Sequence, residues 1–368
     1  MHTFYSILIL WLLSNMVMFG QVDFSKYSIE ASVFHGQTLE HNAEIAHLLT
    51  SRPSGFSFSW NTTVDPEKYW SYKNNFPELG VSFLYHNSHV EALGTNYSLY
   101  GHIHWYFAAR HLQLKLAQGV AYADNPYHPD KNYRNNAYGS KLLSATRLEL
   151  NFVKKYIFQG LGIYTGLGIV HYSNGATKKP NTSTNTGYAH IGMRYDWEPY
   201  KKNQIGSYNW EREKERTRWF YEVLVRSGAN QSGIGESTRG FFVAGGSVGK
   251  RWSYRSGWHI GGEFFYSPFL KDHIRFRSIA YPEMNYTGRE DTNRVGLYVG
   301  YDLYISDELS LYADLGYYLY WPVQYERRVY NRAGIKYQIA DSPLFAVLGV
   351  KAHFSKAESL EIGIGYKW

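Results

Sequence analysis

A histidine and a serine that could together hydrolyse an ester, His171 and Ser173, lie two residues apart in the chain. In a β-strand, residues i and i+2 share a face, so both side chains are predicted to project to the same side. A serine hydroxyl is a weak nucleophile until a nearby imidazole accepts its proton, and a third group must hold that imidazole. Asn185 follows the turn-rich segment 175–184 and falls on the same side of the next predicted strand, which makes it the candidate third group.

The strand that carries this pair is predicted to have one apolar face. From Leu161 the odd positions are Leu, Ile, Thr, Leu and Ile, whereas the even positions are Gly, Tyr, Gly and Gly. His171 and Ser173 continue the odd register, so we expect them to point outward with the apolar residues. A His-x-Ser spacing also arises by chance, and polar residues at an interface need no chemistry. The spacing alone therefore leaves a catalytic and a structural interpretation open.

The composition and the alternation favour an all-β membrane protein. The chain of 368 residues contains 35 Tyr and 34 Gly, and segments such as Val295–Leu303 and Leu348–Phe354 alternate apolar with small or polar residues. The mean hydropathy is −0.42, and beyond the first two dozen residues no apolar run approaches the ~20 residues of a spanning helix. A soluble sandwich also alternates, but lipid-exposed barrels combine alternation with many aromatic and small residues. We predict a transmembrane antiparallel outer-membrane β-barrel.

The end of the sequence supports this prediction. The segment Leu360–Trp368 places apolar and aromatic residues on one face and Glu, Gly, Gly and Lys on the other. Its order, polar-x-Gly-x-x-aromatic-x-aromatic, resembles the signal by which the barrel-assembly machinery recognises outer-membrane barrels. A closing strand must leave no open edge in lipid. The same sequence pattern occurs once inside the chain, at His190–Trp197.

Four segments are predicted along the chain. The apolar stretch Phe4–Phe19 indicates a signal peptide over residues 1–20, with a short membrane anchor as the alternative. Residues 21–197 are predicted to form about eight strands, 198–215 a polar connection, and 216–368 the additional C-terminal strands. We expect a single barrel of about 14–16 strands, because two closed barrels need two complete outer faces. An eight-stranded barrel followed by a second barrel is the alternative.

Charge and residue types limit the partners. The net charge is +7, but Lys and Arg are scattered among acids, so nucleic acid is not expected, and phosphorylated lipids are an equally good anionic partner. The absence of cysteine excludes disulfides and thiol chemistry. No HExxH motif or carboxylate cluster marks a metal site, and we expect neither a metal nor a cofactor. His102 and His104 share a face near Trp105 and are predicted to be girdle or lumen residues.

The stretch His171–Ala176, followed by Pro180 and Asn181, resembles the lipid A 3-O-deacylase family of PagL-like, acyloxyacyl hydrolase-like outer-membrane barrels. Upstream segments resemble the longer family members: His41–Leu48, Pro53–Phe56 and Asn135–Ser140. The resemblance extends over about Tyr27–Trp197, and the rest of the chain has no counterpart in the short members. It implies hydrolysis of an ester-linked acyl chain of lipid A.

The resemblance also implies roles for individual residues. Ser173 would be the nucleophile and His171 the general base. Oxyanion-stabilising or substrate-binding roles are implied for four further residues: Asn174, Gly175, Ala176 and Asn181. The short members complete the triad with a glutamate, where this chain has Asn185. An amide can orient an imidazole but cannot stabilise its cation by charge, and in serine proteases such a replacement costs on the order of 10⁴ in rate. A slower enzyme, a different acid and an inactive copy all remain open.

The sequence thus predicts an outer-membrane serine esterase that acts on the lipid A of lipopolysaccharide. The strand with His171 is the seventh in our count, and odd strands that start from a periplasmic N-terminus end at the outer leaflet, where lipopolysaccharide lies. The alternative is a non-catalytic barrel, either a pore or a structural scaffold. Asn185 and the unassigned second half of the chain favour this alternative.

Overall fold

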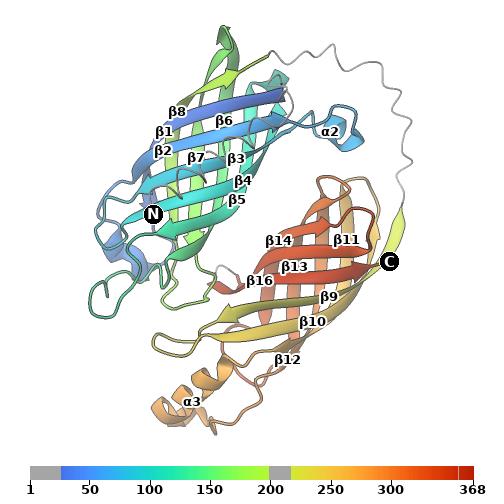
Figure 1. Cartoon of the computed structure of the whole chain (residues 1–368). Helices are drawn as coiled ribbons and strands as arrows, with labels where there is room; N and C mark the ends of the chain where they lie inside the picture. Colours follow the sequence, from blue (N-terminus) through green and yellow to red (C-terminus); the bar gives the residue numbers. More distant parts are fainter. Residues whose placement is uncertain (1–25, 199–216, 355) are drawn as a thin grey trace, which may run out of the picture.

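The computed structural model describes residues 26–198, 217–354 and 356–368, which form two closed antiparallel β-barrels of eight strands each (Figure 1). The first barrel comprises β1 (Tyr27–Leu39), β2 (Ser54–Thr63), β3 (Glu78–Asn87), β4 (Thr95–Phe107), β5 (Leu112–Ala123), β6 (Leu142–Phe158), β7 (Leu161–Ser173) and β8 (Thr184–Asp196). The second comprises β9 (Arg218–Asn230), β10 (Arg239–Arg251), β11 (Ser256–Tyr266), β12 (Arg294–Tyr304), β13 (Leu309–Tyr320), β14 (Val329–Gln338), β15 (Leu344–His353) and β16 (Lys356–Lys367). Short helices lie in the connections: η2 (Ala43–Leu48), α2 (Tyr69–Lys73), η3 (Ala108–Arg110), α3 (Leu270–Ala280) and η5 (Pro282–Met284).

The preferred expectation of one large barrel is wrong, and the alternative of two barrels is confirmed. Strand β1 pairs with β8 over twelve positions, from Ser28 opposite Asp196 to Leu39 opposite Asn185, which closes the first barrel. Strand β16 pairs with β9 and closes the second. The two copies of the sequence pattern, which begin at His190 and Glu361, lie in these two closing strands. Each copy therefore ends a barrel, and a repeated closing strand is the physical reason why the chain closes twice.

Both barrels have the apolar outer face that lipid requires. Alternate residues of each strand are exposed and apolar, for example Leu167 on β7 (69 % exposed), Ile191 on β8 (62 %) and Ile362 on β16 (64 %). At the ends of the closing strands, aromatic rings pair as in an interface girdle, with ring centroids 5.2 Å apart for Tyr195–Trp197. The corresponding pair of the second barrel, Tyr366–Trp368, is 5.7 Å apart. The predicted alternation is confirmed in both halves of the chain.

Buried charges fill the lumen of the first barrel. The Arg194 guanidinium lies 2.7 Å from carboxylate oxygens of Glu30 and Asp196 and 2.9 Å from Glu78. His102, one of the histidines predicted to lie in the girdle or the lumen, is inside, with its Nε2 2.8 Å from Asn61 Oδ1. Paired and hydrogen-bonded charges are the form in which a barrel interior tolerates burial.

The lumen of the second barrel is filled in the same way. The Arg332 guanidinium contacts Glu361 at 2.7 Å, Glu263 at 3.1 Å and Asp314 at 3.3 Å. A cavity beside this network, lined in part by His259, has a volume of only about 10 Å³. Such a volume holds about one water molecule. Charged and polar side chains therefore occupy the described lumens of both barrels, as is usual for eight-stranded barrels.

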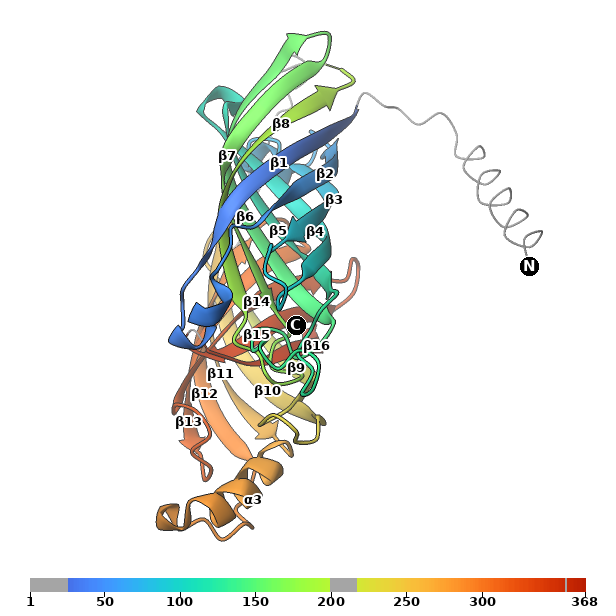
Figure 2. The same ribbon diagram turned by 90° about the vertical axis from the view of Figure 1, so that its left-hand side faces the viewer.

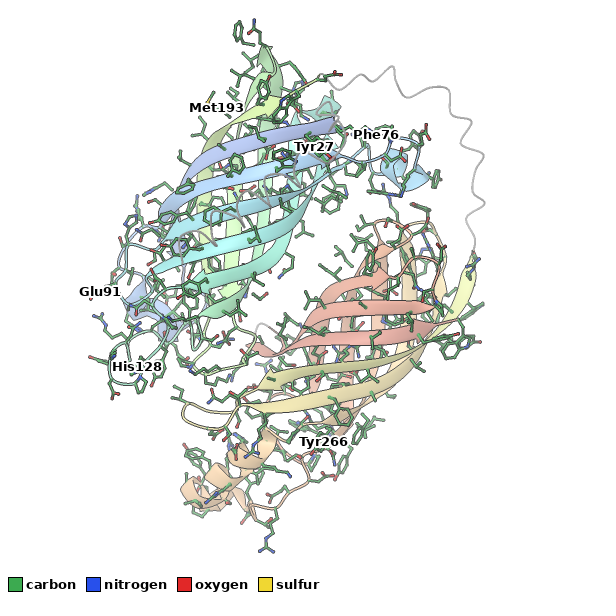
Figure 3. All side chains as sticks on the ribbon, viewed as in Figure 1. Tyr27, Phe76, Glu91, His128, Met193 and Tyr266 are labelled. Atoms are coloured by element: carbon green, nitrogen blue, oxygen red, sulfur yellow. The ribbon has the colours of Figure 1, made fainter. Side chains whose placement is uncertain are left out.

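The longer loops gather at one end of each barrel. Figure 3 shows Glu91 and His128 at the lower-left end of the first barrel and Tyr266 toward the lower end of the second barrel. Helix α3 extends from the same end of the second barrel in Figure 2. Strand β7 runs toward this end of the first barrel, and in outer-membrane barrels the longer loops are extracellular.

The predicted signal peptide, residues 1–20, and nearly all of the predicted polar connection, 198–215, fall outside the described residues. Among the residues that are described, no helix has the length and apolarity needed to cross a membrane.

Candidate active site

A row of polar side chains crosses the outer face of four neighbouring strands, β5 to β8. In the cross-strand register Gln118 lies opposite Thr146, and Thr146 lies opposite His171. His171 lies in turn opposite Asn185. The row interrupts the apolar stripe of each strand, and lipid offers no hydrogen-bond partners to polar groups. Polar and ionisable residues on the outer wall of a membrane barrel are expensive and mark functional sites by default.

His171 and Ser173 lie on the outer side of β7, because the residue between them points inward. Tyr172 is fully buried in the lumen, where its hydroxyl lies 3.1 Å from Ser98 Oγ. The imidazole Nδ1 of His171 is 2.7 Å from Asn185 Oδ1. An amide oxygen accepts a hydrogen bond from Nδ1–H, and this tautomer leaves Nε2 free to take up a proton. Asn185 thus orients the imidazole as a general base requires.

Two hydrogen-bond donors surround the Ser173 hydroxyl. Its oxygen lies 3.0 Å from Nδ2 of Asn181 and 3.1 Å from the backbone N–H of Gly175. The backbone N–H of Asn174 donates to Asn181 Oδ1 at 2.9 Å and so fixes the plane of that amide. The Asn174 side chain donates to the Lys178 carbonyl oxygen at 2.7 Å, which holds the loop together. Donors fixed in this way around an oxygen can stabilise negative charge that develops beside it.

The site is only partly assembled. In the described part of the chain no hydrogen bond joins His171 to Ser173, since the serine hydroxyl is occupied by Asn181 and Gly175. Both residues nevertheless line one cavity of about 110 Å³. Their Cα atoms are about 6.6 Å apart along the strand, and rotation about the Cα–Cβ bond of Ser173 changes the direction in which Oγ points. Hydrogen bonds of this kind are often loose until substrate is bound.

Ala176 plays a different part from the donors around Ser173. It is buried, and its carbonyl oxygen accepts a hydrogen bond from the backbone N–H of Gln231 at 3.1 Å. Gln231 belongs to the second barrel, so this contact attaches the loop after the serine to that barrel. Gly175, next to it, has a φ of +60°, a conformation that glycine adopts without strain.

Three further polar residues of this wall were not predicted from the sequence. Thr146 donates to Gln118 Oε1 at 2.7 Å, and Gln118 Nε2 donates to Ser144 Oγ at 3.0 Å. A signal was present, because Gln118 interrupts the outward apolar series Leu114, Leu116 and Val120. Recognising it requires the register between strands, which places these residues beside His171.

The residues that line the cavity show whether another carboxylate could take the place of the triad glutamate. Its residues come from both barrels, and within the described ranges none of them is acidic. The described lining of this cavity therefore offers no replacement carboxylate, and the imidazole of His171 contacts Asn185, which is not among the lining residues.

Comparison with protein families gives two matches, one for each barrel. Residues 54–194 match the family described as lipid A 3-O-deacylase (PagL). Residues 219–368 match the family described as acyloxyacyl hydrolase, C-terminal domain. The second match assigns a family to the C-terminal part of the chain, which has no counterpart in the short family members. No curated protein matches the chain significantly.

Solved structures resemble the chain at low identity. The crystal structure of the outer membrane enzyme PagL is 19 % identical over 44 % of this chain and 97 % of its own, with a TM-score of 0.28. Neisserial surface protein A is 11 % identical over 46 % and 96 %, with a TM-score of 0.28. A mutant porin of Rh. blastica is 9 % identical over 93 % and 99 %, with a TM-score of 0.20. On the two family matches and the barrel fold, the chain belongs to the PagL-like, acyloxyacyl hydrolase-like family of outer-membrane β-barrels.

Proposed function

We propose that this protein is an outer-membrane serine esterase that removes a 3-O-linked acyl chain from lipid A. The observation that supports this most is the 2.7 Å contact between His171 and Asn185, on the same outward wall as a serine surrounded by hydrogen-bond donors. The family match over the first barrel supports an ester hydrolase that acts on lipid A. A lipid substrate reaches this wall sideways from the outer leaflet.

Acylation begins when the Ser173 hydroxyl turns toward Nε2 of His171. Nε2 takes the hydroxyl proton while Oγ forms a bond to the carbonyl carbon of the ester. The carbonyl oxygen becomes an oxyanion, which the amide of Asn181 and the N–H of Gly175 stabilise once they leave the serine oxygen. The bond between the carbonyl carbon and the sugar oxygen then breaks, and that oxygen leaves with the proton from Nε2. The products of this step are the sugar hydroxyl and an acyl-Ser173 ester.

Deacylation repeats these transfers with water in place of serine. The imidazole of His171 takes a proton from water as the water oxygen adds to the acyl carbon, and the bond to Ser173 Oγ breaks with return of the proton. The free fatty acid leaves. Asn185 keeps the imidazole in the required tautomer, but its neutral amide stabilises the imidazolium less than a carboxylate does. We therefore expect a slow enzyme.

The pore alternative has no support from the interior of either barrel. The lumens are occupied by ion pairs around Arg194 and Arg332, and the cavity in the second has room for about one water. A scaffold without activity is the remaining alternative, and it predicts that loss of Ser173 changes nothing.

Release of fatty acid from purified lipopolysaccharide tests the proposal. Full-length protein in detergent micelles should release one fatty acid per lipid A, and Ser173→Ala and His171→Ala should abolish release. Thr165→Ala is the matched control, because Thr165 lies on the same outer face of β7 opposite Ile191 and is not among the residues that line the cavity. Release that persists in Ser173→Ala, or its absence from the wild-type protein, would refute the esterase.

A further inference from the structure

The cavity at Ser173 lies between the two barrels and has two unlike walls. The first barrel contributes polar residues: Gln118, Ser144, Thr146, His171 and Ser173. The second barrel contributes small and aliphatic residues, including Ala333, Ile335, Leu348, Val350 and Leu360. A cavity with one polar and one apolar wall suits an acyl ester, whose carboxyl end is polar and whose chain is not.

The apolar wall is a continuous part of the outer face of the second barrel. In the cross-strand register Ala333 lies opposite Val350, and Val350 lies opposite Leu360, so these residues form a row across β14, β15 and β16. Ile335 and Leu348 form the next row. We call these five residues the acyl wall.

Contacts at both ends of the barrels hold the acyl wall against the site. At the end with the longer loops, Gln231 Oε1 accepts a hydrogen bond from the Lys179 N–H at 2.6 Å. At the opposite end, Asn74 Nδ2 donates to the Ile305 carbonyl oxygen at 3.1 Å. The ring of Tyr69 in α2 also packs edge-on against Tyr254, with centroids 4.8 Å apart.

The loop that holds the nucleophile also packs tightly against β16 of the second barrel. A Cβ atom on Gly175 would lie 2.8 Å from Leu360 Cβ, closer than two real side chains pack. Only glycine therefore lets β16 come this near to Ser173. The residue that donates its N–H to the serine is the same one that touches the second barrel.

We propose that the acyl wall is the acyl-binding surface of the esterase and determines which chain lengths it accepts. The inference rests on the proposed function, which assigns an ester to Ser173. The ester group would lie against the polar row of the first barrel and the adjoining methylenes against Val350 and Leu360. At about 110 Å³ the cavity is smaller than a typical ligand pocket of about 300–1,000 Å³. It takes only the part of the chain next to the ester, and the remainder extends between the barrels toward the bilayer.

The first experiment tests the contact between the acyl wall and the site, without reference to activity. The chain has no cysteine, so a pair introduced as Gly175→Cys and Leu360→Cys is free of competing thiols. Disulfides need Cβ atoms about 3.5–4.5 Å apart, which a slight opening of this contact provides. We expect the disulfide to form on oxidation in outer membranes, detected as a cross-linked peptide by mass spectrometry. The control pairs Gly175→Cys with Leu315→Cys, on the outer face of β13, and should not cross-link.

The second experiment tests selectivity with full-length protein in micelles. We compare kcat/KM for two esters, 4-nitrophenyl myristate and 4-nitrophenyl acetate, and take the ratio of the first to the second. The ratio is measured in wild type and in Val350→Phe, which adds an aromatic ring to the acyl wall. We expect the ratio to fall at least about tenfold, since pocket changes of one or two methylenes have effects of this size. Val299→Phe, on the outer face of β12, is the control and should keep the wild-type ratio.

The outcomes separate the two proposals. The acyl wall is overturned if the disulfide between positions 175 and 360 does not form. It is also overturned if Val350→Phe changes the ratio no more than Val299→Phe does. The esterase stands in both cases. Ester hydrolysis that is absent or does not depend on Ser173 overturns the esterase, and with it the acyl ligand, even where the disulfide forms.

Discussion

Replacing Asn185 with aspartate should make the enzyme faster. The amide oxygen of Asn185 lies 2.7 Å from His171 Nδ1, so an aspartate carboxylate, which differs by one atom, can accept the same hydrogen bond. A neutral hydrogen bond contributes about 1 kcal/mol and one to a charged group about 1.5–3 kcal/mol. The imidazolium formed during acylation should therefore gain about 1–2 kcal/mol, which corresponds to roughly a 5- to 30-fold higher rate.

Desolvation keeps this gain modest. Coulomb's law gives about 4 kcal/mol for two charges 4 Å apart at an effective dielectric constant of 20, but the carboxylate must also be taken out of water at the barrel wall. The opposite change, Asn185→Leu, removes the acceptor and should lower kcat about tenfold or more, because the imidazole loses its fixed tautomer.

Initial rates of fatty acid release from lipid A in mixed micelles measure these effects. Gln37→Glu serves as the control. Gln37 lies on the outer face of β1 opposite Gly187, so this substitution adds a carboxylate to the same wall away from the imidazole. If Asn185→Asp is no faster than wild type, or Asn185→Leu is as fast, then Asn185 does not orient the base.

Other residues and both lumens give further predictions. Asn181→Ala removes a donor 3.0 Å from Ser173 Oγ, and kcat should fall about 10²- to 10³-fold in single-turnover experiments with little change in substrate affinity; an unchanged kcat would exclude Asn181 from the oxyanion site. Arg332→Ala leaves the buried Glu361 carboxylate without its 2.7 Å partner and should lower the free energy of unfolding by about 3–5 kcal/mol in urea titrations of the folded barrel. Arg239→Ala, which breaks a partly exposed pair, should cost at most about 1 kcal/mol, and equal losses in both variants would contradict the burial argument. In planar bilayers the protein should give no steady channel conductance, because side chains fill both lumens; stable ohmic steps would show an open pore.

The strands and the outward direction of the site could be predicted from the sequence, because both depend on a period of two residues. The alternation from Leu161 places His171 outward whatever the number of strands in the barrel. The number of barrels could not be predicted in the same way. It depends on which strand pairs with β1, and β8 and β16 do not differ in their alternation. The signal that marks β8 as a closing strand is the pattern that His190–Trp197 shares with the last strand.

The second wall of the site was beyond sequence reasoning for a related reason. Val350 and Leu360 lie on an outer face that has the composition of any lipid-facing strand. Their place opposite Ser173 follows from how two closed barrels pack, and contacts between Gln231 and the loop after the serine fix that packing. Gln118 could have been found, but only once the register of β5 against β6 was known.

Lipid A extracted from a Gram-negative host that has no such deacylase provides the most direct test of a lipid A esterase at Ser173. Expression of the wild-type protein should lower the mass of lipid A by one ester-linked acyl chain in mass spectra, and Ser173→Ala, present in the outer membrane at the same level, should leave lipid A intact. Identical spectra for the two proteins would contradict an esterase at this serine.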